Sequence, residues 1–149
     1  KIINTGFGGS KASDLLYYIK ELVLDFNPSK VIIYEGDNDI SSGHKINFIM
    51  KNIKQIIKQI KEINKNAQII LISAKPSISR WHLRDKYIQL NQKYRELANK
   101  SDFIEFADTW SAMVENGVLK KDIFIEDGLH LNEKGYEIWE KTLKKVFYK

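Results

Sequence analysis

Two short runs of β-branched apolar residues, separated by a long amphipathic segment, constrain the fold of this chain more than any other feature. The runs are KVIIYE at Lys30–Glu35 and QIILIS at Gln68–Ser73, and both have the length and composition of buried strands. Between them, isoleucines recur with helical spacing over Ile46–Asn64. A strand, a helix and a second buried strand predict a parallel pair, because parallel strands need a crossover connection and are covered on both faces.

The rest of the chain continues this alternation. We expect a short strand at Ile2–Asn4, a glycine-rich turn, and a helix that Ser10 caps. Further along, the pattern predicts a polar loop at 36–43, helices at 84–100, 108–116 and 132–147, and a strand at 103–106. The 149 residues therefore predict a single α/β domain with a mostly parallel sheet.

Composition excludes several function classes. The net charge is +5, but the lysines are scattered with few aromatic residues between them, which indicates a solvated surface and no nucleic-acid partner. Cysteine is absent, so neither a disulfide nor a thiolate metal site is available. No apolar run approaches the roughly 18 residues of a membrane span. The compartment and the oligomeric state stay open.

Polar segments follow the predicted strands and precede the last helix. In a parallel sheet such segments meet at the carboxyl ends of the strands, where ligands bind. One of them, Asp127-Gly128-Leu129-His130, places a carboxylate three residues before an imidazole, a spacing that makes side chains neighbours on one helical turn. The carboxylate of Asp127 can then accept the Nδ1 hydrogen of His130 and leave Nε2 free as a base.

Three segments together resemble the SGNH (GDSL-type) family of serine esterases and lipases. They are the glycine block Thr5–Ser10, the G-x-N-D block Gly36–Asp39 and the D-x-x-H block Asp127–His130, in the family's order. The stretches 34–40 and 73–81 also resemble bacterial relatives of the platelet-activating-factor acetylhydrolases. The resemblance implies a three-layer α/β/α domain with a flavodoxin-like parallel sheet, a small ester as substrate, and no cofactor or metal.

The resemblance also implies roles for single residues. His130 corresponds to the general base and Asp127 to the residue that orients it. The backbone N–H of Gly9 and the side-chain amide of Asn38 correspond to oxyanion donors. Asp39 is expected to brace the loop that holds Asn38.

The family's first block, which carries the nucleophilic serine after the first strand, has no counterpart in this sequence. We therefore expect that strand and its serine to lie upstream of Lys1, and the domain of residues 1–149 to lack its first strand. The expectation would be contradicted if Ile2–Asn4 paired directly with Lys30–Glu35.

Other interpretations stay open at this point. Ser10 could be the nucleophile, although G-x-S-x-G is not matched. Asp37, Asp39, Asp127 and His130 could form a hard-metal site. The glycine turn could bind a nucleotide phosphate, or the domain could be a non-catalytic remnant or carbohydrate-binding module.

Overall fold

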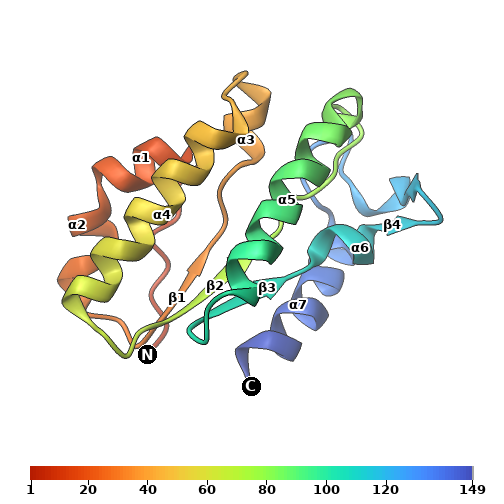
Figure 1. Cartoon of the computed structure of the whole chain (residues 1–149). Helices are drawn as coiled ribbons and strands as arrows, with labels where there is room; N and C mark the ends of the chain where they lie inside the picture. The colour runs from red at the N-terminus through yellow and green to blue at the C-terminus, as the bar shows by residue number, and fades with distance from the viewer. Residues whose placement is uncertain (149) are drawn as a thin grey trace.

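A computed structural model describes residues 1–148 and contains a parallel sheet with helices on both faces (Figure 1). The sheet has the order β1-β2-β3, with parallel pairing that places Lys30 opposite Gln68 and Ile69 opposite Ile104. Its strands are β1 (Lys30–Ile33), β2 (Gln68–Ile72) and β3 (Ile104–Ala107). A separate antiparallel hairpin joins β4 (Val114–Glu115) and β5 (Val118–Leu119). The predicted α/β class and parallel sheet are confirmed.

The helices form the two outer layers. In chain order they are α1 (Ala12–Tyr17), α2 (Ile19–Leu22), α3 (Asp37–Ser41), α4 (Ile46–Ile63), α5 (Arg84–Asn99), α6 (Thr109–Met113) and α7 (Glu133–Phe147). Short 3₁₀ turns are η1 (Leu24–Phe26), η2 (Trp81–Leu83) and η3 (Lys121–Ile123). Helices α1, α4 and α5 cover one face of the sheet, and α7 covers the other, which makes three layers (Figure 1).

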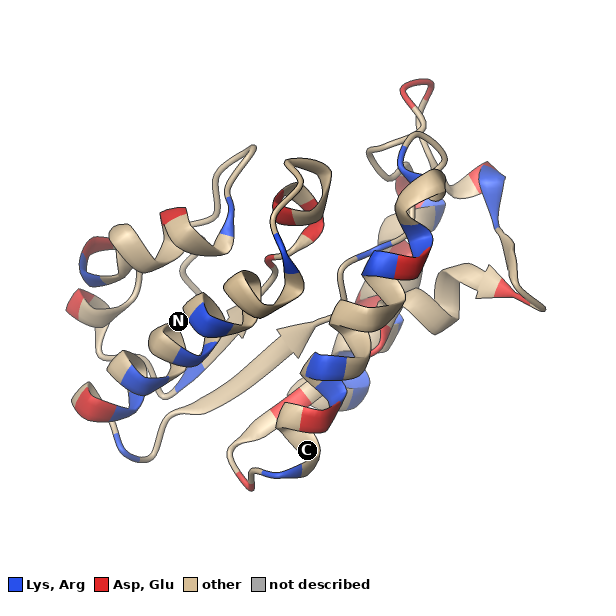
Figure 2. Cartoon of the chain, turned by 45° about the horizontal axis from the view of Figure 1, so that its top comes forward, with Lys and Arg blue, Asp and Glu red and all other residues tan. Residues whose placement is uncertain are grey.

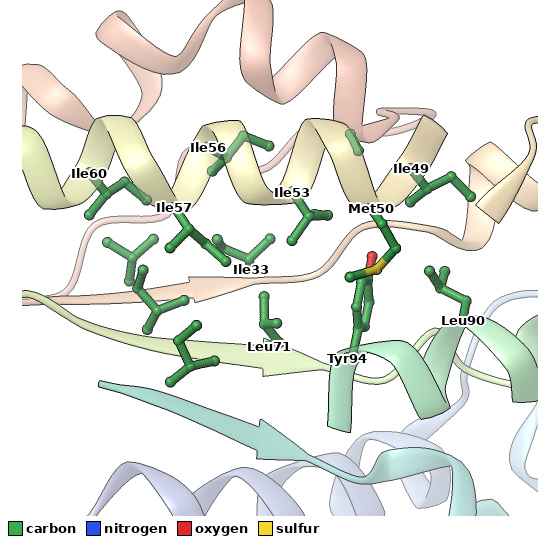
Figure 3. Packing of buried hydrophobic residues seen from close by; sticks show 14 of the residues in the cluster. Ile33, Ile49, Met50, Ile53, Ile56, Ile57, Ile60, Leu71, Leu90 and Tyr94 are labelled. Atoms are coloured by element: carbon green, nitrogen blue, oxygen red, sulfur yellow. The ribbon is translucent and has the colours of Figure 1, made fainter. Parts of the chain in front are cut away.

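The main core lies between α4 and the sheet. The isoleucine stripe of α4 packs on Ile33 of β1 and Leu71 of β2, and Leu90 and Tyr94 of α5 close its end (Figure 3). On the opposite face, Ile70 and Ile72 pack against α7. From Ile69 to Ile72, strand β2 is therefore buried on both sides, which is why these four residues form a continuous apolar run.

Four local predictions were wrong. Ile2–Asn4 forms no strand, because no described segment, β1 included, pairs with it in a ladder of backbone hydrogen bonds. The segment 36–43 contains the helix α3. The helix predicted at 108–116 ends at Met113, because Asn116 and Gly117 both have positive φ and turn the chain into a hairpin. Ser10 caps nothing, since its hydroxyl donates to Glu35 instead.

Candidate active site

A pocket of about 200 Å³ lies at the carboxyl ends of β1 and β2. The chain segments that follow these two strands meet there with the glycine turn at the beginning of the chain and with the loop that precedes α7. Gly9, Asn38 and His130 all line this pocket, and Asp127 lies behind His130, to which it is hydrogen-bonded. The structure thus brings together the four residues that the sequence singled out.

Asp127 and His130 form a directly bonded pair. The distance between Asp127 Oδ2 and His130 Nδ1 is 2.5 Å. The second carboxylate oxygen of Asp127 accepts the backbone N–H groups of Leu129 and His130 at 2.8 and 2.9 Å. The bond with the His130 ring is the largest cause that lowers the pKa of Asp127 to about 2, and the two backbone bonds are smaller ones. The carboxylate is therefore ionised at neutral pH.

The pair meets in a tight turn and not on a turn of helix, contrary to the expectation from spacing. Gly128 has a φ of 63°, in the left-handed region, and this reversal folds the carboxylate back onto the imidazole. The turn is closed by hydrogen bonds from Ile125 N to His130 O and from Gly128 N to Ile125 O. Gly135 lets α7 approach this loop, because a Cβ there would lie 2.6 Å from the carbonyl oxygen of Ile123.

Asn38 reaches the pocket from α3, directly after β1. Its Nδ2 donates to the carbonyl oxygen of Ser10 at 3.0 Å, and its Oδ1 accepts from Arg80 at 3.2 Å. Gly36 is the N-cap residue of α3; its φ of 113° excludes most side chains, and an added Cβ would collide with Cδ2 of Leu90. The glycine of the G-x-N-D block is therefore required by both backbone conformation and packing.

A largely buried ionic cluster in the wall of the pocket was not predicted from the sequence. Asp37 Oδ1 accepts from Arg80 Nη1 and Tyr87 OH, both at 2.6 Å, while Oδ2 accepts from Tyr34 OH at 3.0 Å and lies 3.3 Å from Lys75 Nζ. Burial alone would raise the pKa of Asp37, but Lys75, Tyr87 and Arg80 together lower it. The sequence indicated for Asp37 only its place in the G-x-N-D block and a possible role as a metal ligand. The sequence feature that could have indicated the cluster is the presence of two cations, Lys75 and Arg80, in the loop directly after the apolar run Ile69–Ile72.

The cluster also contacts the loop that carries the histidine. Lys75 Nζ donates to the carbonyl oxygen of Leu129 at 2.7 Å, one residue before His130. The side chain of Lys75 is only 9% exposed, and burial lowers its pKa more than Asp37 raises it. A single buried network therefore contacts Asn38 on one side and the His130 loop on the other.

Glu35 and Asp39 accept hydrogen bonds from Ser10 and Ala12, at the end of the glycine turn. Glu35 Oε1 accepts the hydroxyl of Ser10 at 2.9 Å, and burial raises the pKa of Glu35 to about 7. Asp39 is fully buried and accepts the N–H of Ala12 at 3.0 Å, which ties α3 to the start of α1. Ser10 is thus held against a carboxylate, and no hydrogen bond joins it to His130 in the part of the chain that the structure describes.

The described residues give less support to a metal site, a membrane span or a nucleic-acid interface. Within residues 1–148, no group of three or more acidic or histidine side chains is arranged to hold a metal ion. No helix of that range has both the length and the apolar character to cross a membrane. Lys and Arg residues are spread along α4, whose only acidic residue is Glu62, and along α5, where they alternate with Asp85 and Glu96 (Figure 2). Nucleic-acid binding is not indicated. A larger surface depression on α4, of about 500 Å³, is lined by lysines, amides and a methionine and has no acid–base pair.

The three-layer α/β/α fold is that of hydrolases of the SGNH (GDSL) type, and the Asp127–His130 pair lies at the pocket at the edge of its sheet. Comparison of the sequence with family patterns agrees: the chain belongs to the GDSL-like Lipase/Acylhydrolase family, which it matches over residues 1–138. Membership makes it a hydrolase by kind and indicates small-molecule esters as substrates. No curated protein sequence matched the chain significantly.

Solved structures of similar fold include three informative ones. A Streptococcus pneumoniae protein, provisionally described as a platelet activating factor, is 28% identical with a TM-score of 0.87, over 98% of this chain and 72% of its own. A GDSL-like lipase from Bacteroides thetaiotaomicron is 26% identical with a TM-score of 0.82, over 97% of this chain and 74% of its own. An acetylxylan esterase from Geobacillus stearothermophilus is 20% identical with a TM-score of 0.79, over 96% of this chain and 70% of its own. At this identity the likeness is one of fold alone.

Proposed function

We propose that this protein is a serine esterase that hydrolyses short acyl groups, such as acetyl, from a sugar or lipid alcohol. The observation that carries the proposal is the bonded Asp127–His130 pair beside a pocket that Gly9 and Asn38 also line. The acetyl preference draws on the acetylxylan esterase of the same fold. The pocket of about 200 Å³ is small, which also favours a short acyl group.

The reaction proceeds through an acyl-serine intermediate. A serine hydroxyl attacks the ester carbonyl carbon, and its proton passes to Nε2 of His130, while Asp127 supports the imidazolium through Nδ1. The carbonyl oxygen becomes an oxyanion, which accepts from Gly9 N–H and Asn38 Nδ2. Collapse breaks the bond to the alcohol, whose oxygen takes the proton from His130, and water then releases the acid by the same steps.

The nucleophilic serine belongs to a segment that precedes Lys1. Two features of the fold support this placement. Strand β1 pairs with β2 on one side and with no described strand on its other side, and Ile32 in the middle of β1 is 44% exposed. A parallel strand added beside β1 would end at the rim where the pocket lies and would bring a hydroxyl to His130. The side chain of His130 is 68% exposed and accessible to it.

The direct test is labelling of the full-length protein with a fluorophosphonate probe, followed by mass spectrometry of the labelled peptide. We expect one modified serine, upstream of Lys1, and turnover of p-nitrophenyl acetate that falls with longer acyl chains. His130→Ala should abolish both. The matched control is His82→Ala, an exposed histidine in η2 that lines no part of the pocket.

Two results would contradict the proposal. A folded full-length protein that neither reacts with the probe nor turns over p-nitrophenyl acetate would be a non-catalytic member of the family. Labelling at Ser10 would move the nucleophile into the glycine turn and remove the upstream segment from the mechanism.

A further inference from the structure

We propose that Arg80 is a positioning residue that fixes the orientation of the Asn38 side-chain amide, so that the pocket receives its N–H group and not its oxygen. The inference rests on the proposed function for its catalytic consequence, but the orientation itself is a property of the fold. It assigns a role to a residue outside the three sequence blocks that marked the site.

The argument begins with the two partners of Asn38. Arg80 Nη1 lies 3.2 Å from Oδ1, and the carbonyl oxygen of Ser10 lies 3.0 Å from Nδ2. A guanidinium can only donate and a backbone carbonyl can only accept. A flipped amide would set its NH₂ against the guanidinium and its oxygen against the carbonyl, so only one orientation satisfies both partners. The second hydrogen on Nδ2 then remains available to the pocket that Asn38 lines.

Arg80 can impose this orientation because it is itself fixed. Its Nη1 also donates to Asp37 Oδ1 at 2.6 Å, and its backbone N–H donates to Ser77 Oγ at 3.3 Å. The side chain of Arg80 is 18% exposed and that of Asp37 is 10% exposed, so solvent competes little for this contact. The buried carboxylate therefore holds the guanidinium, and the guanidinium holds the amide.

The catalytic consequence follows from what an oxyanion hole requires. A donor stabilises the transition state only when it already points at the developing charge, and the loss of one such donor lowers kcat by about 10²–10³. An Asn38 amide free to rotate would present its oxygen, which repels an oxyanion, in part of the population. Loss of Arg80 should consequently affect kcat more than KM.

The test is a double-variant cycle in the full-length protein with p-nitrophenyl acetate. We expect Asn38→Ala to lower kcat by about 10²–10³, and Arg80→Met to lower kcat by a large part of that factor with KM little changed. In the Asn38→Ala background, Arg80→Met should add little, because the group through which it acts is gone. Arg80→Lys, which keeps one charged donor for Asp37, should retain more activity than Arg80→Met.

Arg84→Met is the matched control. Arg84 is four residues further along, lies over the ring of Trp81 and lines no part of the pocket, so its loss should leave kcat unchanged. Two kinetic results would overturn the inference: an equal loss from Arg80→Met in both backgrounds, which means an action independent of Asn38, or a rise in KM at constant kcat, which means direct binding of substrate.

A measurement without catalysis separates this inference from the proposed function. In nuclear magnetic resonance spectra of the full-length protein, the Asn38 side-chain NH₂ should show contacts to protons of Ser10 and Lys11 in the wild type and in Arg84→Met. Arg80→Met should lose or average them. If the protein has no esterase activity but the contacts disappear in Arg80→Met, the proposed function fails and the positioning role stands. Contacts that persist in Arg80→Met would refute the positioning role.

Discussion

The buried Glu35 should make the stability of this protein fall as the pH rises toward neutrality. The Glu35 side chain accepts a hydrogen bond from the hydroxyl of Ser10 in the glycine turn, and the residue is 7% exposed. Burial is the main cause that raises the pKa of Glu35 from its ordinary value of 4.5 to about 7, with smaller contributions from the nearby Asp39 and Asp14, while the bond from Ser10 opposes them. A group whose pKa is higher in the folded state binds a proton more tightly there than in the unfolded chain. Its stabilising effect is therefore complete below pH 4.5 and is lost as the pH rises through about 7.

The size of the effect follows from the difference between the two pKa values. At 1.36 kcal/mol for each pH unit, the wild-type chain should lose about 3 kcal/mol of unfolding free energy from this group between pH 4.5 and 8. Glu35→Gln keeps an oxygen that accepts from Ser10 but cannot titrate. Its unfolding free energy should therefore not show this loss between pH 4.5 and 8.

Urea denaturation at several pH values measures the difference between wild type and Glu35→Gln, in which the contributions of all other groups cancel. The difference should change by about 3 kcal/mol across this range. The control is Glu62→Gln, because the Glu62 side chain is 60% exposed and its curve should run parallel to the wild type. Parallel curves for Glu35→Gln, within about 0.5 kcal/mol, would show that Glu35 is ionised in the folded protein at little cost.

Two further predictions concern the Asp127–His130 pair and the N-cap residue of α3. Asp127→Asn in the full-length protein should lower kcat by about 10²–10⁴, because the NH₂ of the new amide forces the His130 proton onto Nε2. The melting temperature should stay unchanged, because the amide oxygen can still accept from Leu129 N. Unchanged turnover of p-nitrophenyl acetate would remove Asp127 from the mechanism. Gly36→Ala should lower the unfolding free energy measured by urea denaturation by about 2–5 kcal/mol. The backbone at this position has a φ of 113°, and the new methyl group would also collide with the side chain of Leu90. A loss below about 1 kcal/mol would show that the loop relaxes freely.

The sequence predicted those elements whose stability is decided by their own residues. The isoleucine stripe of Ile46–Ile63 is long enough to define a helix and the face that it buries, and its bounds agree with the structure within one residue. The run Ile69–Ile72 is apolar throughout because both faces of β2 are covered there. Ile2–Asn4 shows the converse. Its composition suits a strand, but a strand forms only beside a hydrogen-bonding neighbour, which a local pattern does not reveal.

For the candidate site, the motifs predicted which residues meet, but not how the protein holds them. Asp127 and His130 are close in sequence, and their contact could be anticipated from three-residue spacing, although the turn at Gly128 produces it. Arg80 and Asp37 are separated by 43 residues, and no spacing rule links them. Such a contact depends on where β1 and β2 end relative to each other in the sheet, which only the tertiary structure determines.

The short helix α3 explains why three consecutive polar residues in the G-x-N-D block can do three different things. Successive residues of an α-helix point about 100° apart, so adjacent side chains diverge. Asp37 points to the buried cations, Asn38 to the Ser10 carbonyl and the pocket, and Asp39 to the N–H of Ala12. The polar loop predicted for this segment offers no such fixed divergence. The helix therefore lets one block position the proposed oxyanion donor, hold it through the contact of Asp37 with Arg80, and anchor the start of α1 beside it.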